Sequence, residues 1–294
     1  MIVTLKNNGF SAKIDSYGAQ LISLQDPAGT EYIWQRDPKH WANCSPLLFP
    51  IVGNCRDNKL IIDGRSYDII KHGFCKITDF TVSQPSGSEA AFTIQDSEET
   101  RKSYPYAFCL TLTYTLDADG QLHMNYKVKN TDTQTIHYQI GTHPGFTCPL
   151  EDGEKFEDYV LEFEKEENAG FHSYNAEKLE FDMTTYTKAL DHSRVLPINY
   201  PLFANDAIFF TDLVSKKVAL KNPATGKGVE VAYPDFETIA FWTAAATEAP
   251  FLCVEPWNGS AIRSDEDNDF MNRHYLQNLG VGETKEYRMD IRIL

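Results

Sequence analysis

The sequence predicts an all-β fold, a large antiparallel β-sandwich with few short helices. Apolar and polar residues alternate with a period of two along most of the chain, as expected for strands that bury one face. Turn residues separate these stretches at short intervals, and the helical period of 3.6 residues is weak throughout. No repeat, linker or change in composition divides the chain, so we expect residues 1–294 to form a single domain.

The individual strands follow from this alternation, taken in chain order. In the first half, strands are predicted at residues 10–14, 21–24, 31–34, 59–62, 67–70, 110–116, 122–128 and 136–143. Asp63-Gly64 lies between two apolar runs and is a strong hairpin signal. In the second half, strands are predicted at residues 207–210, 218–220, 229–232, 239–242, 251–254 and 287–294. We expect single helical turns at 38–41 and 101–104, and a solvated acidic face at 162–167.

Composition limits the class of partner. The net charge of −15 argues against binding to nucleic acids or anionic membranes, because both require basic patches. The six cysteines are scattered and include no C-x-x-C pair, which is typical of neither a disulfide framework nor a zinc module. No signal-peptide pattern or membrane-spanning run is present, so a cytoplasmic location is expected.

The stretch at residues 140–146 contains the first candidate for chemistry. We expect His143 to end a strand rigidly, because Pro144 cannot continue a ladder and Gly145 permits a turn. Strand parity places His143 on a polar outer face, opposite the face that packs inward. There it could donate a proton to a polar ligand; the alternative is a turn histidine in a structural hydrogen bond.

The second candidate is Glu255, which follows the apolar run 251–254 and precedes Pro256. We expect Pro256 to end the strand. Burial among apolar neighbours would raise the pKa of the Glu255 carboxyl, which suits a general base. The alternative is a strand-end residue that is paired with an arginine.

Three other residues are weaker candidates. His72 precedes a glycine that would let the backbone approach a ligand, and Arg56 offers fixed donors for sugar hydroxyls or carboxylates. Asp206 precedes the apolar run 207–210. A metal site made by His72, His143 and Glu255 is disfavoured because no metal-binding motif supports it. The nucleophile elbow, the G-x-G-x-x-G fingerprint and the P-loop are also absent from the sequence.

Four short motifs occur in an order that resembles the aldose 1-epimerase (galactose mutarotase-like) family, with similarity to its LacX-like branch. They are Asn54-Cys55-Arg56, His72-Gly73-Phe74, Thr142-His143-Pro144-Gly145 and Glu255-Pro256-Trp257-Asn258. The resemblance runs nearly end to end. It implies a β-supersandwich that interconverts the α and β anomers of aldoses without a cofactor.

The resemblance also implies roles for the candidates. Glu255 would be the general base and His143 the general acid, on opposite sides of a bound sugar ring. His72 and Arg56 would orient the substrate, and Asp206 would bind it. If His143 is protonated while Glu255 is ionised, ordinary pKa values of about 6.5 and about 4.3 predict a bell-shaped rate profile near neutral pH.

The sequence leaves the substrate and the activity open. Lys76 stands where the branch that acts on hexose 6-phosphates usually has an arginine, and a lysine could meet a phosphate as a point charge. The expected partner is therefore a hexose or a hexose phosphate, bound by a monomer or a homodimer. A non-catalytic carbohydrate-binding protein with Trp257 and other aromatics stacked on sugar is the main alternative. Glycoside hydrolysis is a third possibility, which would require a second carboxylate.

Overall fold

The computed structural model describes residues 1–84 and 86–294, and it has the all-β fold that the sequence predicts. In these residues the strands are arranged in two large antiparallel sheets, with a three-stranded sheet and two small antiparallel pairs beside them. The single α-helix of this part of the chain is α1 (Thr100–Ser103). No helix there has the length and the apolar character that crossing a membrane requires.

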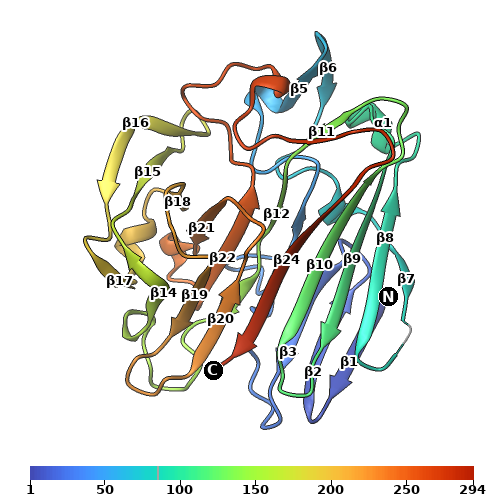
Figure 1. Cartoon of the computed structure of the whole chain (residues 1–294). Helices are drawn as coiled ribbons and strands as arrows, with labels where there is room; N and C mark the ends of the chain where they lie inside the picture. The colour runs from blue at the N-terminus through green and yellow to red at the C-terminus, as the bar shows by residue number, and fades with distance from the viewer. Residues whose placement is uncertain (85) are drawn as a thin grey trace.

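The first large sheet has nine strands and contains most of the segments in which apolar and polar residues alternate clearly (Figure 1). In spatial order its strands are β17 (Ser193–Pro197), β14 (Val160–Glu167), β19 (Lys217–Lys221), β20 (Gly228–Ala232), β24 (Thr284–Ile293), β10 (Leu122–Asn130), β9 (Phe108–Leu116), β8 (Glu89–Gln95) and β7 (Thr81–Ser83).

The second large sheet carries the candidate residues. In spatial order its strands are β16 (Glu180–Lys188), β15 (Gly170–Asn175), β18 (Ile208–Phe210), β21 (Thr238–Trp242), β22 (Phe251–Asn258), β12 (Ile140–Thr142) and β4 (Leu47–Leu48). The short strand β13 (Gly145–Thr147) also pairs with β22. Every residue of β22 is buried, which explains why this strand reads as a continuous apolar run instead of an alternating one.

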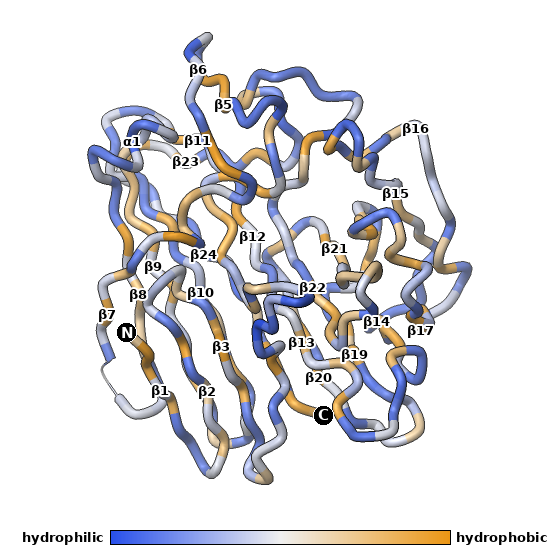
Figure 2. Tube along the Cα trace, turned by 180° about the vertical axis from the view of Figure 1, so that it is seen from behind, coloured by the Kyte–Doolittle hydropathy of each residue, from blue (hydrophilic) through white to orange (hydrophobic). Residues whose placement is uncertain are grey.

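Smaller elements complete the fold. The three-stranded sheet consists of β1 (Ile2–Asn7), β2 (Phe10–Asp15) and β3 (Gln20–Gln25), and the small pairs are β5 (Lys59–Ile62) with β6 (Arg65–Asp68) and β11 (Ile136–Tyr138) with β23 (Gln277–Leu279). Figure 2 shows hydrophobic and hydrophilic residues alternating along β1 and β2. The pairing of β5 with β6 confirms the predicted Asp63-Gly64 hairpin.

The two large sheets enclose one hydrophobic core. Phe163 of β14 contacts Phe241 of β21 across the sandwich, with ring centroids 6.1 Å apart. Leu5, Leu110, Leu161 and Val254, which come from three different sheets, belong to the same buried cluster. The core thus fixes the position of β22 and of the side chains that it presents on its other face.

Several expected elements differ from the structure. Residues 136–143 are not one strand, because β11 and β12 belong to different sheets. On the face predicted to be polar and outward, His137 is half-buried, but Gln139, Gly141 and His143 are buried. The Gln139 amide accepts from Val52 N at 3.3 Å and donates to His274 O at 2.9 Å. Residues 31–34 form isolated bridges only. The acidic stretch at 162–167 lies in β14, and its Glu167 is buried and accepts from two backbone amides.

Candidate active site

The candidate site is built where β22 meets the chain between β12 and β13. Gly141 is opposite Trp257 and Gly145 is opposite Cys253, so the register is the same on both sides of the His143-Pro144 break. This register places His143 directly opposite Glu255. Val254 N donates to Pro144 O at 3.1 Å. The next pair along the strands, His143 and Glu255, is therefore a non-hydrogen-bonded pair, whose side chains lie close together on one face.

Two sequence expectations about this segment are therefore wrong. Pro144 and Gly145 do not turn the chain, since the segment stays paired with β22 on both sides of the break. Pro256 does not end its strand either, because β22 continues to Asn258 between two partners. A proline removes one ladder donor, but neighbouring strands on both sides keep the backbone extended.

His143 and Glu255 are in direct contact. His143 Nε2 lies 3.0 Å from Glu255 Oε2, and the two residues are 8% and 1% exposed. In the described residues, His143 Nδ1 and Glu255 Oε1 have no hydrogen-bond partner. The expectation that a sugar ring lies between the two groups is thus incorrect for this structure, and a substrate must approach both from the cavity.

Burial shifts both ionisation equilibria toward the neutral forms. Desolvation lowers the pKa of the His143 imidazole to about 3, and the charges of Lys71 and Lys76 act in the same direction. Desolvation raises the pKa of the Glu255 carboxyl well above its usual value, with a further contribution from Asp206. The rise predicted for Glu255 from its apolar neighbours is confirmed. Its partner is a histidine instead of the arginine that the alternative required.

His72 lies beside this pair in a strained backbone conformation. Its φ is 68°, and the next residue, Gly73, has φ 71°. Gly53 N donates to His72 Nδ1 at 3.1 Å, so the neutral ring carries its proton on Nε2. The ring is perpendicular to that of His143, with centroids 5.6 Å apart. Burial, together with His143, lowers the pKa of His72 well below its usual value.

Tryptophan side chains form the apolar walls of the site. Trp41 stacks on His143 with ring centroids 4.9 Å apart and an interplanar angle of 30°. Trp242 meets His143 edge-on at 5.8 Å. Trp257 is 3% exposed, and its Nε1 has no hydrogen-bond partner within the described residues. A stacked indole favours the protonated imidazole, because the ring face attracts a cation.

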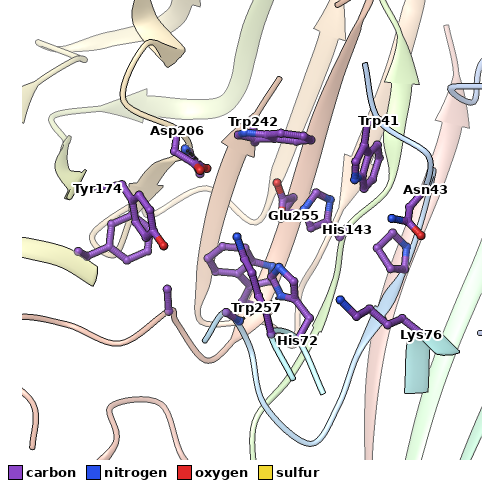
Figure 3. A pocket seen from close by; sticks show the side chains of 16 residues that line it. Trp41, Asn43, His72, Lys76, His143, Tyr174, Asp206, Trp242, Glu255 and Trp257 are labelled. Carbon is purple, nitrogen blue, oxygen red and sulfur yellow. Dashed lines mark hydrogen bonds and ion pairs between the residues drawn. The ribbon is translucent and has the colours of Figure 1, made fainter. Parts of the chain in front are cut away.

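These residues surround a cavity of about 300 Å³ (Figure 3). It is lined by Trp41, Asn43, Pro46, Gly53, Lys71, His72, Lys76, His143, Tyr174, Phe181, Asp206, Ala207, Trp242, Glu255, Trp257 and Ala261. The structure thus brings together six of the seven residues singled out from the sequence: His72, Lys76, His143, Asp206, Glu255 and Trp257.

The remaining candidate, Arg56, does not line the cavity. Its guanidinium forms an ion pair with Glu180 and donates to the backbone carbonyls of Arg263 (3.1 Å) and Glu266 (3.2 Å). Glu180 begins β16, whose next residue, Phe181, lines the cavity. Direct substrate orientation by Arg56 is therefore a prediction that the geometry does not favour, and its contacts are structural.

Sequence reasoning did not select Lys71, Tyr174 or Trp242 as site residues. Lys71 immediately precedes His72 and could have been included with that motif. Tyr174 and Trp242 come from β15 and β21, in segments with no distinctive motif. Only the order of strands in the second large sheet brings them to the cavity.

Potential metal ligands also meet at this site. Among the described residues, the one such group is His143, Cys253 and Glu255, whose ligand atoms lie within 4.8 Å of one another. His72, named in the sequence alternative, is not part of this group. Burial raises the pKa of the Cys253 thiol well above its usual value, which opposes the thiolate that a metal needs.

The fold and the site define a β-sandwich protein with a buried imidazole–carboxylate pair in an aromatic cavity. A family model described as aldose 1-epimerase matches residues 1–272. The chromosomal protein LacX of Lactococcus lactis subsp. lactis is 33% identical over 300 residues, covering 100% of both chains. The chain belongs to the aldose 1-epimerase family, with LacX proteins among its relatives.

Solved structures agree with this assignment. A galactose mutarotase related enzyme from Lactobacillus acidophilus superposes with a TM-score of 0.93 at 28% identity, covering 100% of this chain and 97% of that one. A galactose mutarotase-like protein from Lactobacillus casei superposes with a TM-score of 0.89 at 26% identity, and the match covers 100% of both chains. The predicted β-supersandwich of the mutarotase type is therefore confirmed.

Proposed function

We propose that the protein is an aldose 1-epimerase that interconverts the α and β anomers of an aldose or an aldose phosphate, with no cofactor in the reaction. The observation that carries this proposal is the contact between His143 Nε2 and Glu255 Oε2 at the cavity. Mutarotation needs one group that accepts a proton and one that donates a proton, both within reach of the same hemiacetal carbon. This buried pair supplies both.

The reaction moves two protons and breaks one bond. Glu255 takes the proton from the C1 hydroxyl, and His143 gives a proton to the ring oxygen. The bond between C1 and the ring oxygen breaks, which yields the open-chain aldehyde. After rotation about the C1–C2 bond, the ring oxygen attacks the other face of C1, and both protons return to where they started.

The atoms of the pair that lack hydrogen-bond partners explain how a bound substrate would favour the reactive state, in which Glu255 is ionised and His143 is protonated. Glu255 Oε1 is buried and free in the described structure, so it can accept from a sugar hydroxyl. A donor to the carboxylate favours its ionised form, which moves the shared proton toward His143. Trp41, stacked on the imidazole, favours the protonated ring at the same time.

The other cavity residues suit substrate binding. His72 can present its Nε2 proton as a donor, and Asp206 can accept from sugar hydroxyls. Asp206 Oδ1 already accepts from Ala207 N at 2.7 Å, which holds the carboxylate in place. Trp257 supplies an apolar face together with an indole N–H that lacks a partner in the described residues. Lys76 lies at another side of the same cavity.

Replacing either member of the pair tests this function. We expect Glu255→Gln and His143→Asn each to slow anomer exchange by about 10²–10⁴-fold, because each removes a positioned proton transfer. Exchange is measured by NMR or polarimetry on freshly dissolved sugars. Glu98→Gln and His192→Asn change the same residue types at exposed positions outside the cavity and serve as controls. Full activity of either cavity variant would contradict the assignment.

The same assay separates the alternatives. Three tryptophans line the cavity, so sugar binding without catalysis is the second candidate. Binding of a sugar without faster exchange by the unaltered protein would identify a carbohydrate-binding protein. Release of reducing sugar from oligosaccharides would instead identify a glycosidase, with Asp206 as the second carboxylate.

A further inference from the structure

Glu266 is a buried carboxylate that the proposed reaction does not use. It lies in the segment between β22 and β23, residues 259–276, which we call the strap. Figure 1 shows the strap as the orange-red loop beside β5 and β6, and Asp269 of the strap forms a bridge with Ile61 of β5. The Glu266 side chain is 1% exposed and is not among the described residues that line the cavity. A charge buried at this depth requires partners that compensate for its lost hydration.

The partners of Glu266 come from both ends of the strap. Its Oε2 atom accepts from Arg263 N at 3.0 Å, and its Oε1 atom accepts from His274 N at 2.7 Å. The buried guanidinium of Arg273 pairs with Oε2 at 3.1 Å and donates to Ser260 O at 2.7 Å. One carboxylate therefore closes the strap into a loop of fixed shape.

Arg56 connects the closed strap to β16. Its guanidinium donates to Arg263 O at 3.1 Å and to Glu266 O at 3.2 Å. It also forms an ion pair with Glu180, the first residue of β16. Arg56 thus anchors the strap from outside the cavity.

Backbone hydrogen bonds join the strap to one wall of the cavity. Phe181 N donates to Ile262 O at 2.9 Å, and Ser264 N donates to Phe181 O at 2.8 Å. Phe181 and Ala261 both line the cavity. The position of this wall is therefore set by the strap and by β16 together.

The strap also supports the residue that orients the His72 ring. Ile262 N donates to Asn54 O at 3.3 Å. A Cβ added to Gly53 would lie 2.3 Å from Ala261 Cα, so the two backbones are in direct contact. Gly53 N donates to His72 Nδ1 at 3.1 Å. This bond leaves the proton of the neutral ring on Nε2, from which it can be donated to a sugar hydroxyl.

We propose that Glu266 is a positioning residue for substrate binding. By closing the strap, it holds Ala261 against Gly53. It thereby keeps the His72 ring in the tautomer that donates to the sugar. This inference rests on the proposed function, in which His72 binds the substrate.

The proposed role concerns binding more than proton transfer. The imidazole–carboxylate pair is held by the pairing of β12 and β13 with β22, in which the strap takes no part. Loss of the Glu266 contacts should therefore raise KM while kcat changes little, because a lost binding contact acts on both the bound substrate and its transition state.

Glu266→Gln tests this role by kinetics. The substitution replaces one acceptor oxygen by an NH₂ group, so one of the bonds from Arg263 N and His274 N is lost. We expect KM to rise by roughly three- to tenfold, the effect of one hydrogen bond, and kcat to change by less than about twofold. KM is measured for the aldose that the unaltered protein exchanges fastest.

Glu167→Gln is the matched control. Glu167 of β14 is also buried and accepts from two backbone amides, Val214 N and Ser215 N, but it lies in the other large sheet. The control should keep the KM of the unaltered protein. An unchanged KM in Glu266→Gln, or an equal rise in Glu167→Gln, would overturn the proposal.

Nitrogen NMR of the histidine rings reports the positioning directly. At neutral pH we expect His72 of the unaltered protein to show a single neutral tautomer, with its signals assigned from their absence in His72→Asn. Glu266→Gln should show a mixture of the two tautomers, and Glu167→Gln should keep the single one. A single tautomer in Glu266→Gln would overturn the proposal.

A double variant separates positioning from general stability. Glu266→Gln leaves the charge of Arg273 buried without its counterion, which should lower the urea midpoint. Adding Arg273→Met removes that charge as well and should recover stability, yet the strap still lacks one of its closing bonds. We expect the raised KM and the mixed tautomers to persist in the double variant, which carries the test if the single variant does not fold. Recovery of KM together with stability would overturn the proposal.

Failure of the proposed function is separable from failure of the positioning role. If the unaltered protein exchanges no aldose, the epimerase proposal fails, but the NMR measurement needs no substrate and still tests Glu266. Mixed tautomers of His72 in the Glu266 variants, with a single tautomer in Glu167→Gln, would then support the positioning role. A single tautomer in all of them would overturn it.

Discussion

Because His143 and Glu255 are in contact, the two side chains share a proton and act as one acid–base pair. Both side chains are almost completely buried, and burial disfavours the charged form of each. Their titrations belong to the pair, because the two groups share a hydrogen bond. The state needed for exchange contains one proton on the two side chains.

This state predicts a pH profile that differs from the one based on ordinary pKa values. The pKa of His143 is lowered to about 3, and that of Glu255 is raised well above its usual value. Below the pKa of His143, the pair gains a second proton and no carboxylate remains to act as the base. Above the pKa of Glu255, the pair loses its remaining proton and no acid is left. We therefore expect a bell-shaped profile of kcat/KM whose acidic limb lies below the ordinary carboxyl pKa of about 4.3.

The profile is measured by NMR exchange, with the uncatalysed rate subtracted at each pH and folding checked by circular dichroism. The Glu255→Gln and His143→Asn variants should not show the two limbs. Limbs at the ordinary values of about 4.3 and about 6.5 would contradict the shifts caused by burial.

At the scale of elements, the segment from His72 to Ile77 depends on one glycine. Gly73 has φ 71°, and a Cβ there would lie 2.1 Å from Phe49 O, a backbone atom that cannot easily move. The same segment presents His72 and Lys76 to the cavity. The glycine therefore couples the packing of this segment to the geometry of the site.

Replacement of Gly73 by alanine should be more damaging than its backbone angle alone implies. Gly64 has φ 72°, and an added Cβ there would meet nothing within 4 Å, so Gly64→Ala matches the angle without the clash. We expect Gly73→Ala to lower the free energy of unfolding by about 1–3 kcal/mol more than Gly64→Ala, and to raise KM. Urea unfolding and exchange kinetics measure both effects. Equal losses of unfolding free energy in the two variants would show that the backbone at Phe49 moves to accommodate the added Cβ.

At the scale of the whole molecule, one buried cluster joins the sheets. It includes Leu5 of β1, Leu110 of β9, Leu161 of β14 and Val254 of β22. No part of the sandwich can open without exposing apolar surface from another sheet. We propose on this basis that residues 1–294 behave as a single domain.

A single domain predicts a single unfolding transition. We expect tryptophan fluorescence, near-ultraviolet and far-ultraviolet circular dichroism to report the same midpoint in urea. The Trp residues lie in the second sheet and in the loops that pack on it, whereas far-ultraviolet signal comes from all the sheets, so the probes are independent. Two resolved midpoints would contradict the single domain.

The sequence predicts the features of the fold that depend on local patterns, and it misses those that depend on residues far apart in the chain. Alternation along β9 and β10 is a local pattern, so these strands and the turn between them were predictable. Strand β14 was not, because its acidic residues hide the apolar positions Leu161 and Phe163. The break between β11 and β12 was not predictable either, because Gln139, which lies between these strands, is held by hydrogen bonds that no local pattern indicates.

The sequence by itself determined the fold class, the family resemblance and the residue types that meet in the cavity, because these depend on local alternation and on short motifs. Only the tertiary structure decided that His143 touches Glu255, that Arg56 pairs with Glu180, and that Tyr174 and Trp242 belong to the site. The physical reason is register: the pairing of β12 and β13 with β22 joins segments more than a hundred residues apart. Local sequence does not encode that alignment.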